Sequence, residues 1–266
     1  MTTATQKVKT PYAQLLADAV NKPGVLSSCY SRFHRYSICN QLWAWGQAAA
    51  NNLPLGPIAT LKQWNSLGRK IKKGSQAIYL TLPVIIDEKD PITKEKTGRT
   101  LRLFVPKKNW FFLSQTEGDE YTEETRIAEW DKAKALSELD ISEVEYESTD
   151  GNCQGYAFER SIAVNPVAVL PHKTRFHEIA HIVLGHTTEH KLTDSESTPR
   201  DIREVEAESV AYILCQLLNL PGEVESRGYI QSWLKGESIS DKSARNIFGA
   251  VDKILKAGQE VEVQRV

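Results

Sequence analysis

Two histidines and a glutamate stand at metal-binding spacing in the segment TRFHEIAHIVLGH, residues 174–186. His177, Glu178 and His181 form the pattern HExxH. Residues four apart lie on one face of a helix, so both imidazoles can reach one ion. Glu178 can contact a water on that ion and accept its proton while the water attacks a carbonyl. The pattern predicts a metal-dependent hydrolytic site with Glu178 as general base.

A five-residue HExxH pattern alone is a weak signal, because it arises by chance in helices rich in His and Glu. Its neighbours strengthen it. Apolar residues such as Phe176, Ile179 and Val183 flank it, as a buried active-site helix requires. The β-like segment RSIAVN, residues 160–165, lies just upstream. We expect this segment to be an edge strand that can pair with an extended peptide substrate.

A third ligand can come from a second amphipathic helix, REVEAESVAYILCQLLNL, residues 203–220. Glu204 and Glu208 are four apart and share a face, whereas Glu206 is rotated by about 200° from Glu204 and should point elsewhere. His186 is the competing ligand. It lies nine positions after His177, which does not fit the spacing of metzincins. His172 and His190 flank the helix in polar loops and are expected to be bystanders.

The charges of the chain are divided between its two halves. Over 266 residues the formal net charge is −1, but residues 1–110 carry a net +12 and residues 111–266 a net −13. Such an asymmetry indicates a module that binds a polyanion, joined to a different domain. The 41% apolar and 25% charged residues exclude wholesale disorder.

Hydrophobic periodicity predicts the elements that position these residues. Helices are expected over 11–21, 36–51 and 60–68, with Thr60 as an N-cap, and two β-rich runs over 77–86 and 99–116 predict a long hairpin. The segment GRKIKKG, residues 68–74, is expected to be a turn that presents four positive charges. The acidic segment 117–125 is the predicted linker. We therefore expect an α+β protein of two domains, 1–116 with helices on an antiparallel sheet and 126–266 mainly helical with a small sheet.

Aromatic and basic residues lie together in the first half. Cations neutralise phosphates and flat rings stack on exposed bases, so the mixture suits single-stranded nucleic acid better than a duplex. The alternatives are that the aromatic residues are core and that the basic segment is a solvated turn. The candidate contacts are Arg32, His34, Arg35, Tyr36, Trp64, Arg69, Lys70, Lys72 and Lys73.

The acidic half resembles known metallopeptidases. HExxH followed by ExxAE, residues 204–208, is similar to the gluzincins, and residues 160–186 resemble the core of the ImmA/IrrE-type peptidases. The resemblance implies a zincin-like domain in which His177, His181 and Glu204 bind the metal and Glu208 orients a ligand histidine. One divalent ion is expected, with zinc the default for this ligand set and manganese the alternative.

The basic half resembles the N-terminal domain of ArdC-type antirestriction proteins. The matching stretches are YSICNQLWAW from Tyr36, residues 59–84 around GRKIKKG, and FFLSQTEGD from Phe111. Ser75 and Phe112 depart from the family pattern. The family pairs a domain that binds single-stranded DNA with a C-terminal zinc-peptidase-like domain. The resemblance adds Asn40 to the candidate DNA contacts.

Taken together, these patterns predict a protein that binds single-stranded DNA, cleaves an unknown protein or peptide, and serves a mobile element as an antirestriction factor. The alternatives are a non-catalytic DNA-binding protein with a structural or vestigial metal site, and an ImmA-like regulatory peptidase that cleaves a repressor. Because the chain lacks a long apolar run and begins with a polar segment, we expect a cytoplasmic monomer without a membrane partner. The four cysteines are expected to be reduced.

Overall fold

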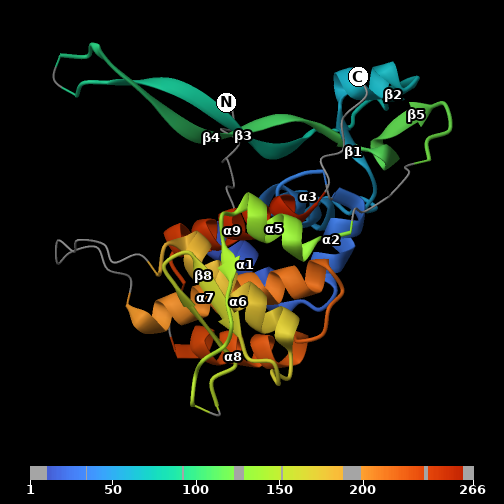
Figure 1. The fold of residues 1–266 in the computed structure, drawn as a ribbon. Coiled ribbons are helices and arrows are strands. Elements are labelled where there is room, and N and C mark those ends of the chain that lie inside the picture. The colour runs from blue at the N-terminus through green and yellow to red at the C-terminus, as the bar shows by residue number, and fades with distance from the viewer. Residues whose placement is uncertain are drawn as a thin grey trace. The chain divides into compact units, whose positions relative to one another are not determined.

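The structure is a computed structural model that describes residues 11–33, 35–91, 93–122, 129–150, 152–187, 199–236 and 239–259. The chain forms two compact units, which we describe separately (Figure 1). The larger unit comprises residues 1–31, 37–39 and 126–266, and the smaller unit comprises residues 32–36 and 40–125. No helix in the described ranges has the length and apolar character that a membrane span requires.

Antiparallel pairing builds the smaller unit. Strands β3 (Ile78–Lys89) and β4 (Lys96–Phe112) form the long hairpin that the sequence predicts, and β1 (Ile58–Thr60) pairs with the end of β4. A separate ribbon joins β2 (Arg69–Ile71) to β5 (Thr116–Gly118). The GRKIKKG segment is therefore not only a turn, since its first half is a strand.

Two helices support the three-stranded sheet of this unit. Helix α3 (Ile38–Ala50) covers the edge of β3, because the Asn40 and Gln47 side chains bond to the backbone of that strand. Helix α4 (Leu61–Ser66) begins at the predicted N-cap, Thr60, which forms a capping box with Gln63. The short 3₁₀ helix η1 (Leu113–Gln115) follows β4.

The outer part of the β3–β4 hairpin exposes apolar side chains. Its register places Val84 opposite Leu103 and Ile86 opposite Leu101, so these four neighbours share one face. Each of them is 40–45% exposed. This part of the hairpin therefore depends on strand pairing and side-chain contacts within the ribbon, without the buried core that supports its base.

Helices dominate the larger unit. Helix α6 packs against α7 and against a three-stranded sheet of order β6-β8-β7, and α9 packs against α1, α5, α6 and α7. Strand β7 is antiparallel to β8, whereas β6 is parallel to it. The elements are α1 (Tyr12–Asn21), α2 (Val25–Phe33), α5 (Lys132–Glu138), β6 (Ser142–Glu143), β7 (Gly155–Phe158), β8 (Ser161–Val164), α6 (Pro171–Leu184), α7 (Arg200–Leu217), α8 (Glu223–Gly236) and α9 (Asp241–Gly258).

The three helices predicted in the first 70 residues are confirmed as α1, α3 and α4, and the mixed α+β composition is confirmed. Helix α2 was not predicted, because its sequence VLSSCYSRF holds serines and a short, irregular apolar pattern. The expectation that RSIAVN is an edge strand is wrong. Its residues form β8, the central strand, and β7 lies at the edge. The end of the predicted linker, residues 123–125, falls outside the described residues.

Candidate metal centre

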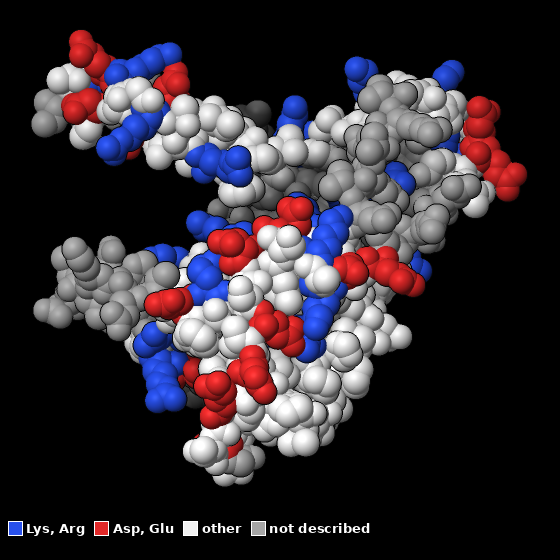
Figure 2. All heavy atoms as spheres, in the orientation of Figure 1, with Lys and Arg blue, Asp and Glu red and all other residues white. Residues whose placement is uncertain are grey.

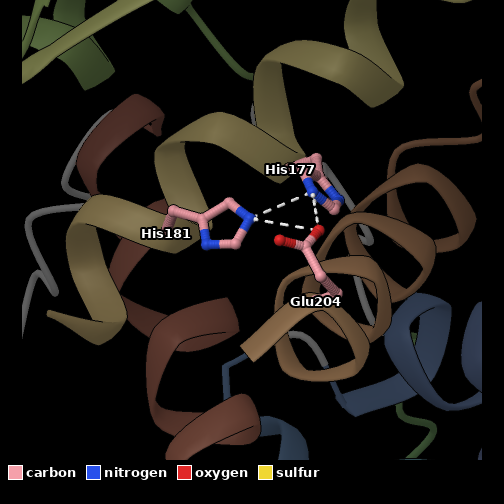
Figure 3. A group of neighbouring side chains, drawn as sticks. All are labelled: His177, His181 and Glu204. Atoms are coloured by element: carbon pink, nitrogen blue, oxygen red, sulfur yellow. Dashed lines mark hydrogen bonds and ion pairs between the residues drawn. The ribbon is translucent and has the colours of Figure 1, made fainter. Parts of the chain in front are cut away.

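Helix α6 brings the HExxH residues to one surface. Proline stands at its first position, Pro171, where its missing N–H costs nothing, and Gly185 ends the helix in the left-handed conformation with φ 80°. His177 and His181 project from the same side of α6 toward α7 (Figure 3). Their Nε2 atoms lie 3.1 Å apart.

Helix α7 supplies the third group. The Glu204 Oε2 atom lies 3.3 Å from Nε2 of His177 and 3.7 Å from Nε2 of His181. Ligand atoms bound at about 2.1 Å in a tetrahedron around zinc lie about 3.4 Å from one another. The three measured separations lie on both sides of this value, so one divalent ion fits among these atoms. Among the His, Cys, Asp and Glu side chains of the described residues, these three bring their ligand atoms within 4.8 Å of one another, close enough to hold one metal ion.

The three side chains differ in exposure, which leaves one side of the group accessible. The side chains of His177 and His181 are 19% and 13% exposed, whereas that of Glu204 is 39% exposed. A catalytic site needs such an open position for water or substrate, whereas structural sites are closed by protein ligands. The exposure of Glu204 is compatible with such an open position.

Glu208 lies behind His177, on the side away from Glu204. Its Oε2 atom is 3.1 Å from Nδ1 of His177, and its Oε1 atom is 2.7 Å from the Lys173 ammonium. Burial acts to raise the pKa of Glu208, but the hydrogen bonds from His177 and Lys173 outweigh it and lower that pKa to about 2. An ionised Glu208 can hold the His177 ring with Nε2 directed at the centre.

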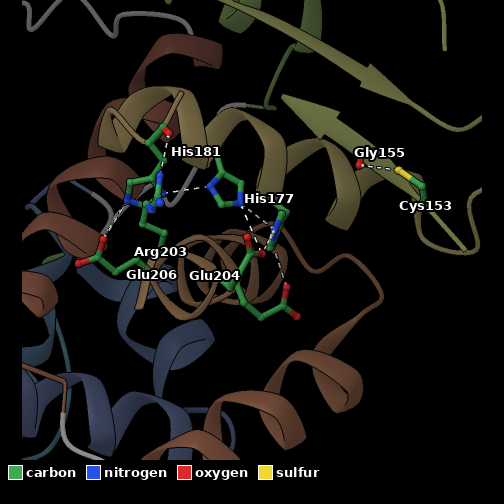
Figure 4. Close-up of polar contacts among 9 residues, drawn as sticks. Cys153, Gly155, His177, His181, Arg203, Glu204 and Glu206 are labelled. Carbon is green, nitrogen blue, oxygen red and sulfur yellow. Dashed lines mark hydrogen bonds and ion pairs between the residues drawn. The ribbon is translucent and has the colours of Figure 1, made fainter. Parts of the chain in front are cut away.

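The polar partners of His181 were not predicted. Nδ1 of His181 lies 3.0 Å from Nδ1 of His186, and Nε2 of His186 lies 3.0 Å from Oε2 of Glu206 (Figure 4). His186 is thus bonded to a candidate ligand, through one ring nitrogen, and to a carboxylate through the other. The 200° rotation of Glu206 from Glu204 does direct it elsewhere, as expected, and its target is His186.

Glu178 is buried between α6 and the edge strand β7. It is 7% exposed, and burial raises its pKa above the ordinary value of a glutamate. A Cβ added at Gly155 would lie 3.3 Å from its Cγ and 2.6 Å from Thr174 Cγ2. The absence of a side chain at Gly155 therefore lets β7 approach the general-base candidate closely.

The centre is electrostatically coupled in the absence of an ion. Burial works to lower the pKa of His177, but the hydrogen bonds that its ring donates to Glu204 and Glu208 prevail and raise it to about 9. The same bonds to His177 and His181 hold the pKa of Glu204 well below its usual range. Two imidazoles and a carboxylate thus converge on one point, where a divalent cation can take the place of a proton.

The candidate DNA contacts separate into two groups. Arg32, Arg35, Lys70, Lys72 and Lys73 are exposed. Arg69 is half-buried, and its guanidinium bonds to Thr116 and to backbone carbonyls of β5 and Asp119. The SQTEG segment, residues 114–118, and Asp119 therefore fix the position of the Arg69 guanidinium at the start of β2.

The other candidates are engaged within the smaller unit. The Trp64 ring is 1% exposed and its N–H donates to the Phe111 carbonyl at 2.9 Å. The Tyr36 hydroxyl donates to the Ile58 carbonyl at 2.9 Å, and Asn40 is buried against Thr81. These contacts favour structural roles for the three side chains. His34 lies outside the described residues.

On the face drawn in Figure 2, basic side chains lie without acidic neighbours along the middle of the β3–β4 hairpin. Strand β4 carries Arg102, Lys107 and Lys108, and all three are exposed. Acidic and basic side chains mix at the hairpin tip and over the larger unit. The basic character of the first half is thus displayed in part on β4, beyond the residues that the sequence singled out.

The fold and the site define a class of protein that joins an antiparallel-sheet unit with exposed cations to a helical unit with a His/His/Glu centre. Residues 2–128 match the model for the N-terminal domain of the anti-restriction factor ArdC. No curated protein matches the chain. Among solved structures, the metal-free antirestriction protein ArdC from plasmid R388 covers 93% of both chains at 20% identity with a TM-score of 0.53. Its Mn(II)-bound form gives 18% identity and a TM-score of 0.51 over the same shares.

Residues 2–128 thus match the N-terminal domain of ArdC, and the chain has the fold of the ArdC structures over nearly its whole length. The resemblance to ArdC-type antirestriction proteins is therefore confirmed.

Proposed function

We propose that this ArdC-type protein binds single-stranded DNA through its smaller unit and carries a divalent-metal peptidase site in its larger unit, in the service of antirestriction. The convergence of His177, His181 and Glu204 beside the buried Glu178 supports the peptidase proposal most strongly. The exposed cations of a domain from an antirestriction family support DNA binding.

The four residues have distinct roles in the proposed hydrolysis. His177, His181 and Glu204 would hold the ion, which when bound lowers the pKa of a water and polarises the carbonyl of the substrate. Glu178 accepts the proton of the attacking water and passes it to the leaving amine. Its burial suits this role, because a raised pKa makes the carboxylate a stronger base.

Strand β7 is the proposed docking edge for the substrate. One of its edges pairs with β8, and no strand among the described residues pairs with the other. An extended polypeptide can add to such an edge through main-chain hydrogen bonds. Because Gly155 brings β7 close to Glu178, a peptide on this strand would run beside the general base.

The ion is proposed to be zinc or manganese. Zinc suits two imidazoles and a carboxylate, and the carboxylate also suits manganese. The Mn(II)-bound structure of ArdC from R388 supports a divalent cation in this fold. The measured separations accommodate either ion, so affinity for the two metals must be measured directly.

Glu178→Gln tests the peptidase proposal, since it keeps the size of the side chain and removes the base. A proteome-derived peptide library is incubated with metal-loaded protein, and products are identified by mass spectrometry. We expect cleavage by the wild type, by Glu138→Gln on the exposed face of α5, and none by Glu178→Gln or after chelation. Equal cleavage by Glu178→Gln, or none by any form at full metal occupancy, would contradict the proposal.

A salt titration tests DNA binding. Affinity for a labelled single-stranded oligonucleotide should exceed that for the duplex and fall with salt, because phosphate contacts release counterions. The double variant Lys70→Ala/Lys73→Ala removes two exposed cations and should reduce the slope of log K against log salt by about 1.4. Lys253→Ala, on the exposed face of α9, is the control. Equal affinity for both DNA forms would contradict the proposal.

A further inference from the structure

We infer that His186 and Glu206 form a positioning pair that fixes the orientation and the tautomer of His181. The inference rests on the proposed metal centre, in which His181 is a ligand. It assigns a task to two polar residues that are not among the proposed ligands, one after the HExxH pattern and one at an unspecified position inside ExxAE.

The pair is buried and held from several directions. The side chains of His186 and Glu206 are 7% and 5% exposed. The backbone N–H of His186 donates to the His181 carbonyl at 2.8 Å, because the left-handed Gly185 turns the chain back over the last turn of α6. Arg203 donates to the His186 carbonyl at 3.4 Å. The imidazole of His186 is therefore fixed beside that of His181.

When both rings are neutral, the hydrogen-bond chain favours one arrangement of protons. A single hydrogen lies between the two Nδ1 atoms, 3.0 Å apart. If His181 offers the Nε2 lone pair to the ion, its Nδ1 carries that hydrogen and Nδ1 of His186 accepts it. Nε2 of His186 then carries its own hydrogen and donates to the Glu206 carboxylate. Each donor meets an acceptor in this arrangement.

The reversed arrangement places two acceptors against each other. If His186 donated from Nδ1, the neutral His186 ring would direct a lone pair at the Glu206 carboxylate across 3.0 Å. His181 would carry its hydrogen on Nε2, where the ion must bind. The buried carboxylate of Glu206 disfavours this state. Glu206 therefore selects the tautomer of His181 through two successive hydrogen bonds, with His186 between them.

Three glutamates of helix α7 thus contact the histidines of the candidate centre or their outer partner. Glu204 faces the ligand position, Glu208 bonds to His177, and Glu206 on the other side bonds to His186. His177 has a carboxylate as its direct outer partner, whereas His181 reaches its carboxylate through an imidazole. The two histidines thus have separate outer partners, and a change at Glu206 should act on the Nδ1 side of His181 and leave the bond between His177 and Glu208 in place.

Glu206→Gln is the decisive variant, because the amide keeps the volume and can bond to either tautomer of His186. Zinc affinity is measured on the full chain by competition with a chromophoric chelator. We expect about a tenfold loss of affinity, with the urea unfolding midpoint of the metal-free protein nearly unchanged. Glu138→Gln should bind zinc as the wild type does. His186→Asn, which retains an acceptor near the position of Nδ1, should lose less affinity than His186→Leu.

Long-range ¹H–¹⁵N spectra of the metal-free protein report which nitrogen of each ring carries its hydrogen. The wild type should show His181 with its hydrogen on Nδ1, and Glu206→Gln should show a mixture. An unchanged tautomer together with wild-type zinc affinity in Glu206→Gln would overturn the inference. If the wild type binds no zinc, the proposed metal centre fails, and the tautomer comparison still decides the positioning role.

Discussion

At the scale of the residue, both ring nitrogens of His177 and of His181 have a partner in the candidate centre. His177 and His181 direct Nε2 toward Glu204, and their Nδ1 atoms bond to Glu208 and His186. Outer partners of this kind set the direction of the lone pair and raise the basicity of the ligand. The affinity of the site should therefore depend on residues that never touch the ion.

Substitution of the carboxylate ligand gives a direct prediction. Glu204→Gln replaces a charged metal ligand by a neutral amide of the same size. We therefore expect zinc affinity to fall by more than about 100-fold, which exceeds the typical loss when a residue that only bonds to a ligand is replaced. Asp201→Asn removes a charge from the same helix without touching the centre and should bind as the wild type does. Chelator competition measures both. Similar affinities for Glu204→Gln and the wild type would remove Glu204 from the ligand set.

A buried carboxylate elsewhere gives a pH-dependent prediction. Burial raises the pKa of Asp252 to about 6. The hydrogen bond that its carboxylate accepts from the Ile38 backbone N–H at 2.9 Å acts in the opposite direction but is the weaker effect. The folded state then binds more protons than the unfolded state between about pH 4 and 6, so stability from this group is present at low pH and falls as pH rises through that window. Asp252→Asn keeps an acceptor without a charge.

We expect Asp252→Asn to match the wild type in stability at pH 4 and to exceed it by about 2 kcal/mol at pH 8. Urea unfolding of both proteins in the presence of a chelator measures this difference, since the other groups cancel in the comparison. A difference that is independent of pH would show that Asp252 is ionised with an ordinary pKa in the folded protein.

At the scale of the element, the centre depends on how closely α6 approaches α7 and β7. Helix α6 packs against both, and small residues permit the contact with the strand. Glu178 lies in this contact, so the position of the proposed general base depends on β7 as well as on its own helix.

Gly155→Ala should disturb that contact. Its Cβ would lie 2.6 Å from Thr174 Cγ2 and 2.9 Å from the Ala163 carbonyl oxygen, so β7 or α6 must shift. We expect a loss of about 1–3 kcal/mol in the free energy of unfolding, together with loss of hydrolysis. Gly46→Ala in α3 meets nothing within 4 Å and should be neutral or stabilising. If Gly155→Ala had the stability and activity of the wild type, β7 would not pack against α6 as described.

Asn40→Ala should act on the smaller unit through its fold. The Asn40 amide donates to the Thr81 carbonyl and accepts from the Thr81 amide and hydroxyl, all within 3.0 Å. Removing it leaves buried backbone groups unpaired, so we expect a loss of about 2–4 kcal/mol in stability. DNA affinity measured well below the unfolding midpoint should be nearly unchanged. A stable variant with weak DNA binding would make Asn40 a contact residue after all.

The sequence predicted those elements whose signals are local. Thr60 with Gln63 marks the start of α4, and the alternation over 77–86 and 99–116 marks the hairpin. It also predicted His177 and His181 on one face of a helix and two candidate glutamates on a second helix, and the choice of Glu204 between them came from the resemblance to the gluzincins. It could not find His186 with Glu206, because that contact depends on the crossing of α6 and α7 and on a turn at Gly185. The strand order around β8 is likewise a tertiary property.

At the scale of the whole molecule, the net charge of −1 is the sum of a basic first half and an acidic second half. The exposed cations of β4 and of the GRKIKKG segment belong to the smaller unit, and the metal centre belongs to the larger one. We interpret this division as a separation of DNA binding from peptide cleavage. An acidic second half would keep DNA away from a site intended for another substrate.

Hydrogen exchange tests the separation. A single-stranded oligonucleotide should protect backbone amides in residues 60–75 and leave those in residues 174–186 unchanged. A mixed-sequence duplex at the same concentration is the control and should protect less. Protection of both segments by the oligonucleotide would mean that DNA and the metal centre share one site.

The central claim is that one divalent ion binds among His177, His181 and Glu204. Anomalous diffraction at the zinc absorption edge, from crystals of the zinc-loaded protein, tests it most directly. We predict one strong peak about 2.0–2.2 Å from Nε2 of both histidines and from a carboxylate oxygen of Glu204. A fully loaded protein with no peak there, or with its peak on other residues, would contradict the account.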